Sequence, residues 1–152
     1  MPDNFKPKDP DFVTKVTSSF ARQKVMQTIG ATIESVNPGE VTLRLPYDES
    51  LTQQHGFIHA GIIATLLDSA CGYAAFSLMP KDAAVLSVEF KTNLMAPAKG
   101  DYFLAKAIVV KPGRTITVTN AELFAYSDGK EKLVASMTGT MMVVYDRDGI
   151  EQ

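Results

Sequence analysis

The sequence predicts an α+β protein in which one antiparallel sheet packs around a single buried helix. Residues 59–79 contain only one charged side chain, Asp68, which is typical of a helix that is buried on nearly all sides. After Pro80 the pattern changes to an alternation of apolar and polar residues, which predicts strands. Four such strands follow in a run with short connections, which favours an antiparallel sheet over βαβ units.

Length and composition limit the possible functions. The 152 residues suggest one domain, which we divide into an extension and short helix (1–28), a main domain (29–146) and a tail (147–152). Fifteen basic against 17 acidic residues argue against a nucleic-acid binder, which needs a basic surplus. The single cysteine, Cys71, excludes an internal disulfide framework and a multi-thiolate metal site. No basic-then-apolar signal pattern opens the chain, so we expect a cytoplasmic protein.

The first elements come from local patterns. A polar N-terminal stretch leads into one short helix near residues 11–28. Asn37–Gly39 is a turn between two short strands. The second strand places Val41, Leu43 and Leu45 on one face, and Pro46 ends it.

The apolar segment 59–79 is long enough to span a membrane. However, Asp68 stands in its middle, where insertion into a bilayer is costly, and no basic cluster or aromatic belt flanks the segment. We therefore expect a central helix buried by the sheet, and no membrane partner.

The strands after Pro80 begin with one in which Leu86, Val88 and Phe90 alternate with polar residues, which predicts that these three share the buried face. The other expected strands cover 101–110, 115–125 and 133–145, with a hairpin turn at 127–130.

Asp68 is the first candidate for chemistry. A carboxylate in the middle of an apolar helix is costly to bury without a partner. Two roles remain open for it. It could hydrogen-bond to neighbouring backbone and fix the core, or it could be a general base or nucleophile in an apolar cleft, where desolvation raises its pKa.

Other reactive side chains have weaker contexts. His55 and His59 have the spacing of metal ligands, but Gly56 stands where the zinc-protease pattern has Glu, and no third ligand is near. The pattern favours a histidine that shapes a loop and predicts no metal. Cys71 is expected to be a packing residue, and Ser69 lacks the glycines of a nucleophile elbow.

The start of the long helix is the second candidate. A polar loop, residues 52–58, leads into the helix near His59. The first amides of a helix have no partner within it and carry the positive end of the dipole. The N–H of Ala60 is therefore placed to polarise a carbonyl or stabilise an oxyanion, unless this is an ordinary helix start with water on its amides.

These residues resemble a family pattern. His59-Ala60-Gly61, with Gln53 six residues before the histidine and Asp68 nine after it, is similar to the motif of the hotdog-fold acyl-CoA thioesterases of the phenylacetate-degradation type. Segments 88–101 and 111–115 resemble later parts of that family, so the similarity covers residues 29–144. Ala60 departs from the family's glycine, yet it still supplies the backbone N–H, and Gln53 stands where related proteins often have Asn.

The resemblance implies a hotdog fold, a curved antiparallel sheet wrapped around a long central helix, and hydrolysis of acyl-CoA thioesters. In this interpretation the Ala60 N–H polarises the thioester carbonyl and Asp68 activates water or attacks directly. Gln53 orients water or substrate, His59 holds the loop, and Ser87 positions the water. The implied substrate contacts are Gly61, Lys111, Gly113, Arg114 and Thr115, with Lys91 as a further cation for the CoA phosphates. No cofactor is implied beyond the CoA of the substrate.

Spacing adds an inference about assembly. Ala60 and Asp68 are eight residues apart, so they lie roughly 12 Å apart along one helix. If both act on one substrate, they come from two subunits related by a two-fold axis, in agreement with the shared-site homodimers and homotetramers of the family.

Two alternatives stay open: another hotdog enzyme, such as an acyl hydratase or dehydratase, and a non-catalytic binder of acyl-CoA or a lipid-like ligand.

The sequence leaves the acyl group open between an aromatic and an aliphatic acid. Four side chains could line its pocket or belong to the core: Phe57, Tyr73, Phe76 and Met79.

Overall fold

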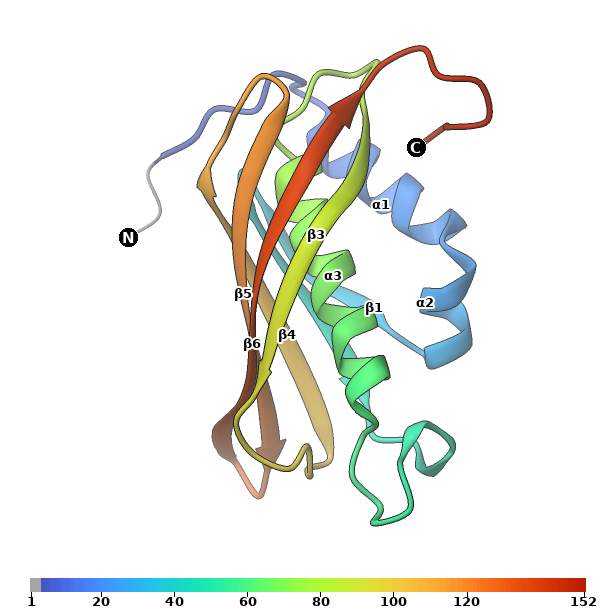
Figure 1. Ribbon diagram of the computed structural model, residues 1–152, viewed down its shortest axis with the longest axis vertical. Helices are drawn as coiled ribbons and strands as arrows, with labels where there is room; N and C mark the ends of the chain where they lie inside the picture. Colours follow the sequence, from blue (N-terminus) through green and yellow to red (C-terminus); the bar gives the residue numbers. More distant parts are fainter. Residues whose placement is uncertain (1–3) are drawn as a thin grey trace.

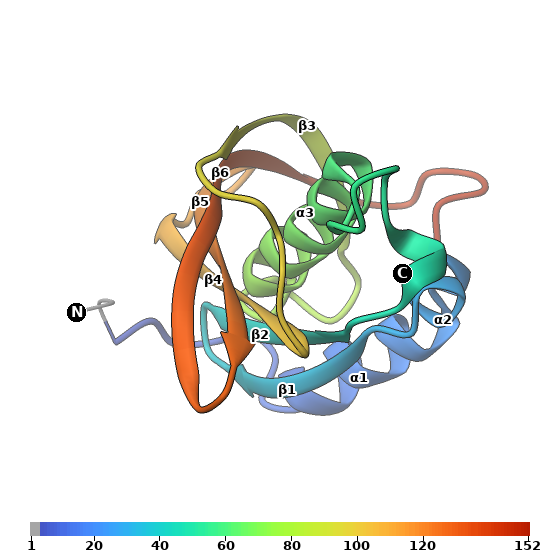
Figure 2. The ribbon, with the colours of Figure 1, turned by 90° about the horizontal axis from the view of Figure 1, so that it is seen from below.

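The computed structural model describes residues 4–152, so residues 1–3 of the predicted extension lie outside it. Within that range one antiparallel sheet of six strands, in the order β1-β2-β4-β5-β6-β3, curves around the helix α3 (Figures 1 and 2). The strands are β1 (Thr32–Asn37), β2 (Glu40–Pro46), β3 (Ala84–Leu94), β4 (Tyr102–Lys111), β5 (Ile116–Ser127) and β6 (Lys130–Val144). The helices are α1 (Phe12–Arg22), α2 (Lys24–Ile29) and α3 (Ala60–Phe76), with a short 3-10 turn at Glu49–Leu51. The predicted α+β architecture is confirmed.

The central helix α3 is apolar because the protein surrounds it. Ten of its 17 residues are buried, and it contacts β2, β3, β4, β5 and β6. On the side of α3 away from β5 and β6 lie α1 and α2 (Figure 1). The helix is shorter than the predicted 59–79, since His59 is its N-cap and residues 77–79 form a turn. No helix in the described part of the chain combines the length and apolarity needed to cross a bilayer.

The single helix expected over residues 11–28 is wrong, because the chain breaks at Gln23. Gln23 has extended backbone angles (φ −79°, ψ 97°), and its N–H closes the last turn of α1 on the carbonyl of Phe20 at 3.0 Å. Helix α2 then ends at Gly30, whose φ of +78° suits glycine. The break directs the Gln23 side chain toward α3, where its Oε1 accepts a hydrogen bond from Ser69 at 3.1 Å.

The hairpin between β5 and β6 follows its turn chemistry. Asp128 and Gly129 both have positive φ, 52° and 72°, as a two-residue type I′ turn requires. Ser127 and Lys130 face each other as the closing pair. The predicted turn at 127–130 is therefore confirmed.

The edge strand β3 corrects the prediction that Leu86, Val88 and Phe90 share a buried face. Ser87 pairs with Met141 and Glu89 with Thr140, so Val88 is an extra residue, a β-bulge. The bulge reverses the alternation along the strand. Ser87 bonds to Asp68 of α3, so its neighbour Leu86 faces away from α3. Phe90 pairs with Gly139, which lies against α3, and is therefore on the α3 side. The side chains of Leu86, Val88 and Phe90 are all more than a third exposed.

Candidate functional site

His59 organises the start of α3. Its Nδ1 accepts a hydrogen bond from the N–H of Gly61 at 2.8 Å, and its carbonyl accepts from Ile62 and Ile63. Its own N–H donates to the carbonyl of Leu51 at 3.0 Å. The His59 side chain is therefore the N-cap of α3, the role that serine or asparagine fills in many helices. Because the Gly61 N–H is hydrogen-bonded to it, that N–H is not available to a substrate.

Ala60 is the first residue of α3, and its N–H remains available. Among residues 4–152 no acceptor takes this N–H, and Ala60 is exposed. The amide lies at the positive end of the α3 dipole. It can donate to the oxygen of a bound carbonyl or an oxyanion.

Gln53 holds the loop that precedes α3. Its Oε1 accepts from the N–H of His55 at 2.5 Å and more weakly from that of Phe57 at 3.4 Å. Its backbone N–H donates to the carbonyl of Phe57 at 2.9 Å. With its oxygen committed to the loop, the Gln53 side chain has its NH₂ left as a donor, and Gln53 and Ala60 line the same groove.

A groove of about 410 Å³ adjoins the Ala60 amide. Apolar side chains form most of its walls: Phe57, Ile58, Ile63, Leu94, Met95, Ala96, Pro97 and Ala98, with Gln53 as the polar contribution. This end of the molecule therefore combines an apolar surface with two N–H donors, the Ala60 amide and the Gln53 side chain.

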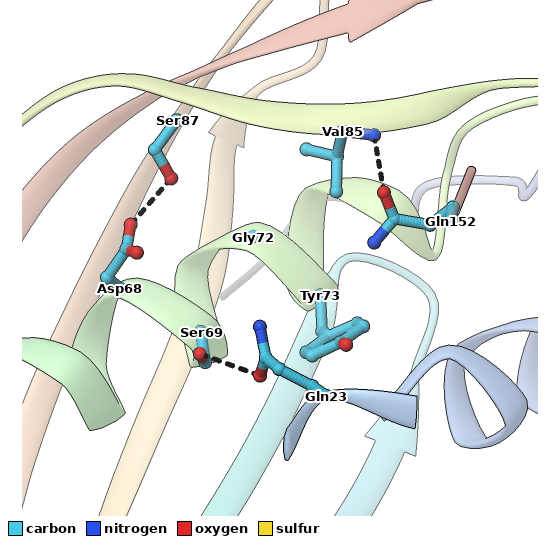
Figure 3. Close-up of a pocket in the computed structure, with 8 residues that line it drawn as sticks. All are labelled: Gln23, Asp68, Ser69, Gly72, Tyr73, Val85, Ser87 and Gln152. Carbon is cyan, nitrogen blue, oxygen red and sulfur yellow. Dashed lines mark hydrogen bonds between the residues drawn. The ribbon is translucent and has the colours of Figure 1, made fainter. Parts of the chain in front are cut away.

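Asp68 and Ser87 form the second polar centre. The Ser87 hydroxyl donates to Oδ1 of Asp68 at 2.6 Å (Figure 3). Burial raises the pKa of the Asp68 carboxyl above its usual range, and the hydrogen bond from Ser87 opposes part of that shift by stabilising the anion. The other carboxylate oxygen receives no hydrogen bond from a described residue. It can therefore accept a proton from water or attack a carbonyl carbon.

Asp68 borders a separate small pocket of about 80 Å³ (Figure 3). Its lining comes from both ends of the chain as well as from α3 and β3: Gln23, Asp68, Ser69, Gly72, Tyr73, Val85, Ser87 and Gln152. Sequence reasoning missed Gln23, Gly72, Val85 and Gln152 as site residues. Nothing in the local pattern marks the two glutamines, since only the folded chain brings them to α3.

The two centres do not meet within one chain. Asp68 borders the small pocket and Ala60 the larger groove, and the two share no lining residue. The two residues lie on the same helix, eight positions or roughly 12 Å apart. One chain therefore presents two half-sites: a carboxylate with its hydroxyl partner, and an N–H donor beside an apolar groove.

The turn between β4 and β5 stays apart from both half-sites of its own chain. All of residues 111–115, including the predicted contacts Lys111, Gly113, Arg114 and Thr115, are exposed, and none lines either pocket. Gly113 is required by packing, because a Cβ there would lie 1.9 Å from the carbonyl oxygen of Ile116. Gly61, in contrast, lies directly at the helix start.

The remaining candidates are divided between the core and the two pockets. Cys71 is fully buried, and burial raises the pKa of its thiol to about 12. Phe76 and Met79 belong to the core, while Tyr73 lines the Asp68 pocket and Phe57 the Ala60 groove. Among the described residues no group of three or more potential ligands is placed to hold a metal ion.

Comparison with known proteins places this geometry in a family. The model of the thioesterase superfamily matches residues 55–132, which include Ala60, Asp68 and Ser87. A crystal structure of a thioesterase family protein from Silicibacter pomeroyi is 58% identical in sequence, with a TM-score of 0.87 over 88% of this chain and 98% of that one.

Two further proteins extend the comparison. Human acyl-coenzyme A thioesterase 13 is 32% identical over 100 residues, which are 65% of this chain and 71% of that protein. The PaaI protein of the Escherichia coli phenylacetic acid degradation operon is 20% identical, with a TM-score of 0.78 over 88% of this chain and 93% of its own. At that identity the likeness shows the shared fold, which confirms the predicted hotdog architecture.

Proposed function

We propose that this chain, which belongs to the thioesterase superfamily and is a thioester hydrolase, hydrolyses acyl-CoA thioesters to a free acid and CoA. The superfamily match supports the reaction class, and the human relative named an acyl-CoA thioesterase supports the substrate class. The observation that carries the proposal is the pair of complementary half-sites, because thioester hydrolysis needs an oxyanion donor and a base or nucleophile together.

The Ala60 N–H donates to the thioester carbonyl oxygen, and the Gln53 NH₂ lies beside it to orient substrate or water. Asp68 takes a proton from the attacking water, or attacks the carbonyl carbon itself to give an anhydride that water then opens. In either route the C–S bond breaks and the CoA sulfur leaves with the electron pair. Ser87 keeps Asp68 oriented through its 2.6 Å hydrogen bond, and no cofactor is needed beyond the CoA of the substrate.

The complete site in this proposal is shared by two chains. The edge strand β3 supports this, since it exposes Val88, Phe90 and Leu94 by 53%, 44% and 55%, and an edge strand pairs readily with a second copy of itself. Antiparallel β3–β3 pairing would bring the Ser87–Asp68 side of one chain toward its partner.

Tetramer formation from such dimers is also part of the proposal. Apolar side chains on the outer face of β4 and β5 are exposed: Ile108, Val110, Ile116 and Val118. We assign the predicted CoA contacts at 111–115 to the assembled protein rather than to the site of one chain. The single buried cysteine needs no oxidising compartment, and a cytoplasmic location fits the proposal.

The test is release of CoA, followed with a thiol-trapping dye, by the wild type, Asp68→Ala and Ala60→Pro. Proline is well tolerated at the first position of a helix, and the preceding His59 already has the extended angles that proline favours (φ −60°, ψ 140°). The Ala60→Pro variant therefore removes one N–H and leaves the helix start intact.

We expect losses of about 100-fold or more in kcat for both variants. Release of CoA that survives in Asp68→Ala would contradict the role of Asp68. Tight binding of acyl-CoA without release by the wild type would favour a ligand binder, and hydration or dehydration of an acyl chain would favour another hotdog enzyme.

A further inference from the structure

Gly72 is a glycine that neither packing nor backbone conformation requires. It stands inside α3, where glycine is less stable than alanine. A Cβ at Gly72 would meet no heavy atom within 4 Å, and its φ is not positive. At Gly139, in contrast, a Cβ would come within 2.9 Å of the Met141 side chain. The missing side chain at Gly72 therefore leaves space open rather than relieving a clash.

That space belongs to the pocket beside Asp68. Gly72 follows Asp68 by one helical turn and lines the same wall (Figure 3). At about 80 Å³ the pocket is several times larger than the space that one water molecule needs, about 10–15 Å³. Of the two parts of an acyl-CoA, only a small acyl group fits, since the pantetheine and nucleotide are far larger.

Two glutamines that line the pocket, Gln23 and Gln152, are held in place by hydrogen bonds. The Gln23 Oε1 accepts from Ser69 at 3.1 Å. Gln152 accepts from the N–H of Val85 at 3.0 Å and donates to Ser19 at 3.1 Å. Because each glutamine side chain already has a partner, this part of the wall has a defined position, whereas at Gly72 the wall has no side chain and a Cβ would meet open space.

We propose that the acyl group of the substrate lies against Gly72, and that the missing side chain at this position sets the largest acyl group that the enzyme hydrolyses. This inference rests on the proposed thioesterase function. It assigns specificity to a residue outside the Gln53, Ala60 and Asp68 pattern and names the substrate class as small acyl groups.

The test compares kcat/KM of the wild type, Gly72→Ala and Gly72→Val on acetyl-, butyryl-, hexanoyl-, octanoyl- and phenylacetyl-CoA. For each variant we compare kcat/KM for the largest accepted substrate with kcat/KM for the smallest. Gly72→Ala adds one methyl group and should lower this ratio by about tenfold or more, which is the discrimination that one methylene gives in a pocket. Gly72→Val should lower it further. Both variants should keep the mass that the wild type has by light scattering. The exposed Ser18→Ala in α1 is the matched control, because it also raises helix propensity but lines none of these walls.

The inference is overturned if the kcat/KM ratio in Gly72→Ala changes by less than about threefold, or if all substrates lose activity equally. Dissociation of the variant would also overturn it, because Gly72 would then belong to the subunit interface. If the wild type releases CoA from no substrate, the proposed function fails separately. Calorimetry with hexanoyl-CoA then decides the role of Gly72. About tenfold weaker binding by Gly72→Val supports the inference, and equal binding, or no binding to the wild type, overturns it.

Discussion

Replacing Asp68 with asparagine should abolish thioester hydrolysis and make the protein more stable near pH 7. Burial raises the pKa of Asp68, so the ionised carboxylate is held in the folded state at a cost. Asparagine has nearly the same shape and no charge, and its Oδ1 can still accept the hydrogen bond from Ser87. The variant therefore removes the desolvation cost and keeps the contact.

The expected gain is modest because Asp68 is only half-buried and Ser87 already offsets part of the cost through its 2.6 Å hydrogen bond. After that discount for solvent, we expect about 0.5–1 kcal/mol. In a chain of this size each kcal/mol corresponds to a rise in Tm of about 2–4 °C.

The stability gained by Asp68→Asn depends on pH. A carboxyl whose folded pKa lies above its unfolded value costs nothing at a pH below the unfolded pKa, and the cost grows as pH rises through the folded pKa. The gain from Asp68→Asn should therefore be largest near neutral pH and shrink toward acid. Thermal unfolding at fixed protomer concentration measures it, with the exposed Asp82→Asn as control. A variant that is less stable than the wild type near pH 7, or a gain that does not change with pH, would refute the reasoning.

Three further predictions concern the surroundings of the two half-sites. Ser87→Ala removes the hydrogen bond that opposes the rise in the Asp68 pKa, so the acid limb of the plot of kcat/KM against pH should move to higher pH. Ser87→Thr keeps a hydroxyl and should leave the acid limb where it is in the wild type. An acid limb that does not move in Ser87→Ala would contradict the role of this hydrogen bond. His59→Ala removes the α3 cap and should cost about 1 kcal/mol in thermal unfolding; His59→Asn should recover part of it, and equal Tm values for Ala and wild type would exclude the capping role. Val88→Asp places a charge on the β3 edge and should lower the mass measured by light scattering together with activity, and an unchanged mass would contradict β3 pairing.

The sequence predicted those elements that a local pattern determines. Segment 59–79 was predicted as a buried helix because its apolar residues leave no polar face, and the hairpin at 127–130 because Asp128-Gly129 suits positive φ. The β3 bulge escaped prediction because apolar and polar residues continue to alternate through Val88, and only the pairing with β6 reveals the extra residue.

The site was predictable only in part. Gln53, Ala60 and Asp68 follow a spacing that carries a family resemblance. Gln23 and Gln152 reach the pocket from distant parts of the chain. Gln23 does so at a helix break that has no proline or glycine, and Gln152 does so because the terminal segment folds back onto β3. Contacts of this kind depend on tertiary packing, for which the local sequence has no signal.

The central claim, that Asp68 of one chain works with Ala60 of another, is tested most directly by a purified heterodimer of Asp68→Ala and Ala60→Pro protomers. Each homodimer has two damaged sites, whereas in the heterodimer one site receives both substitutions and the other receives neither. We predict that the heterodimer hydrolyses acyl-CoA at about half the rate of the wild-type dimer. A heterodimer as inactive as either parent would contradict the shared site.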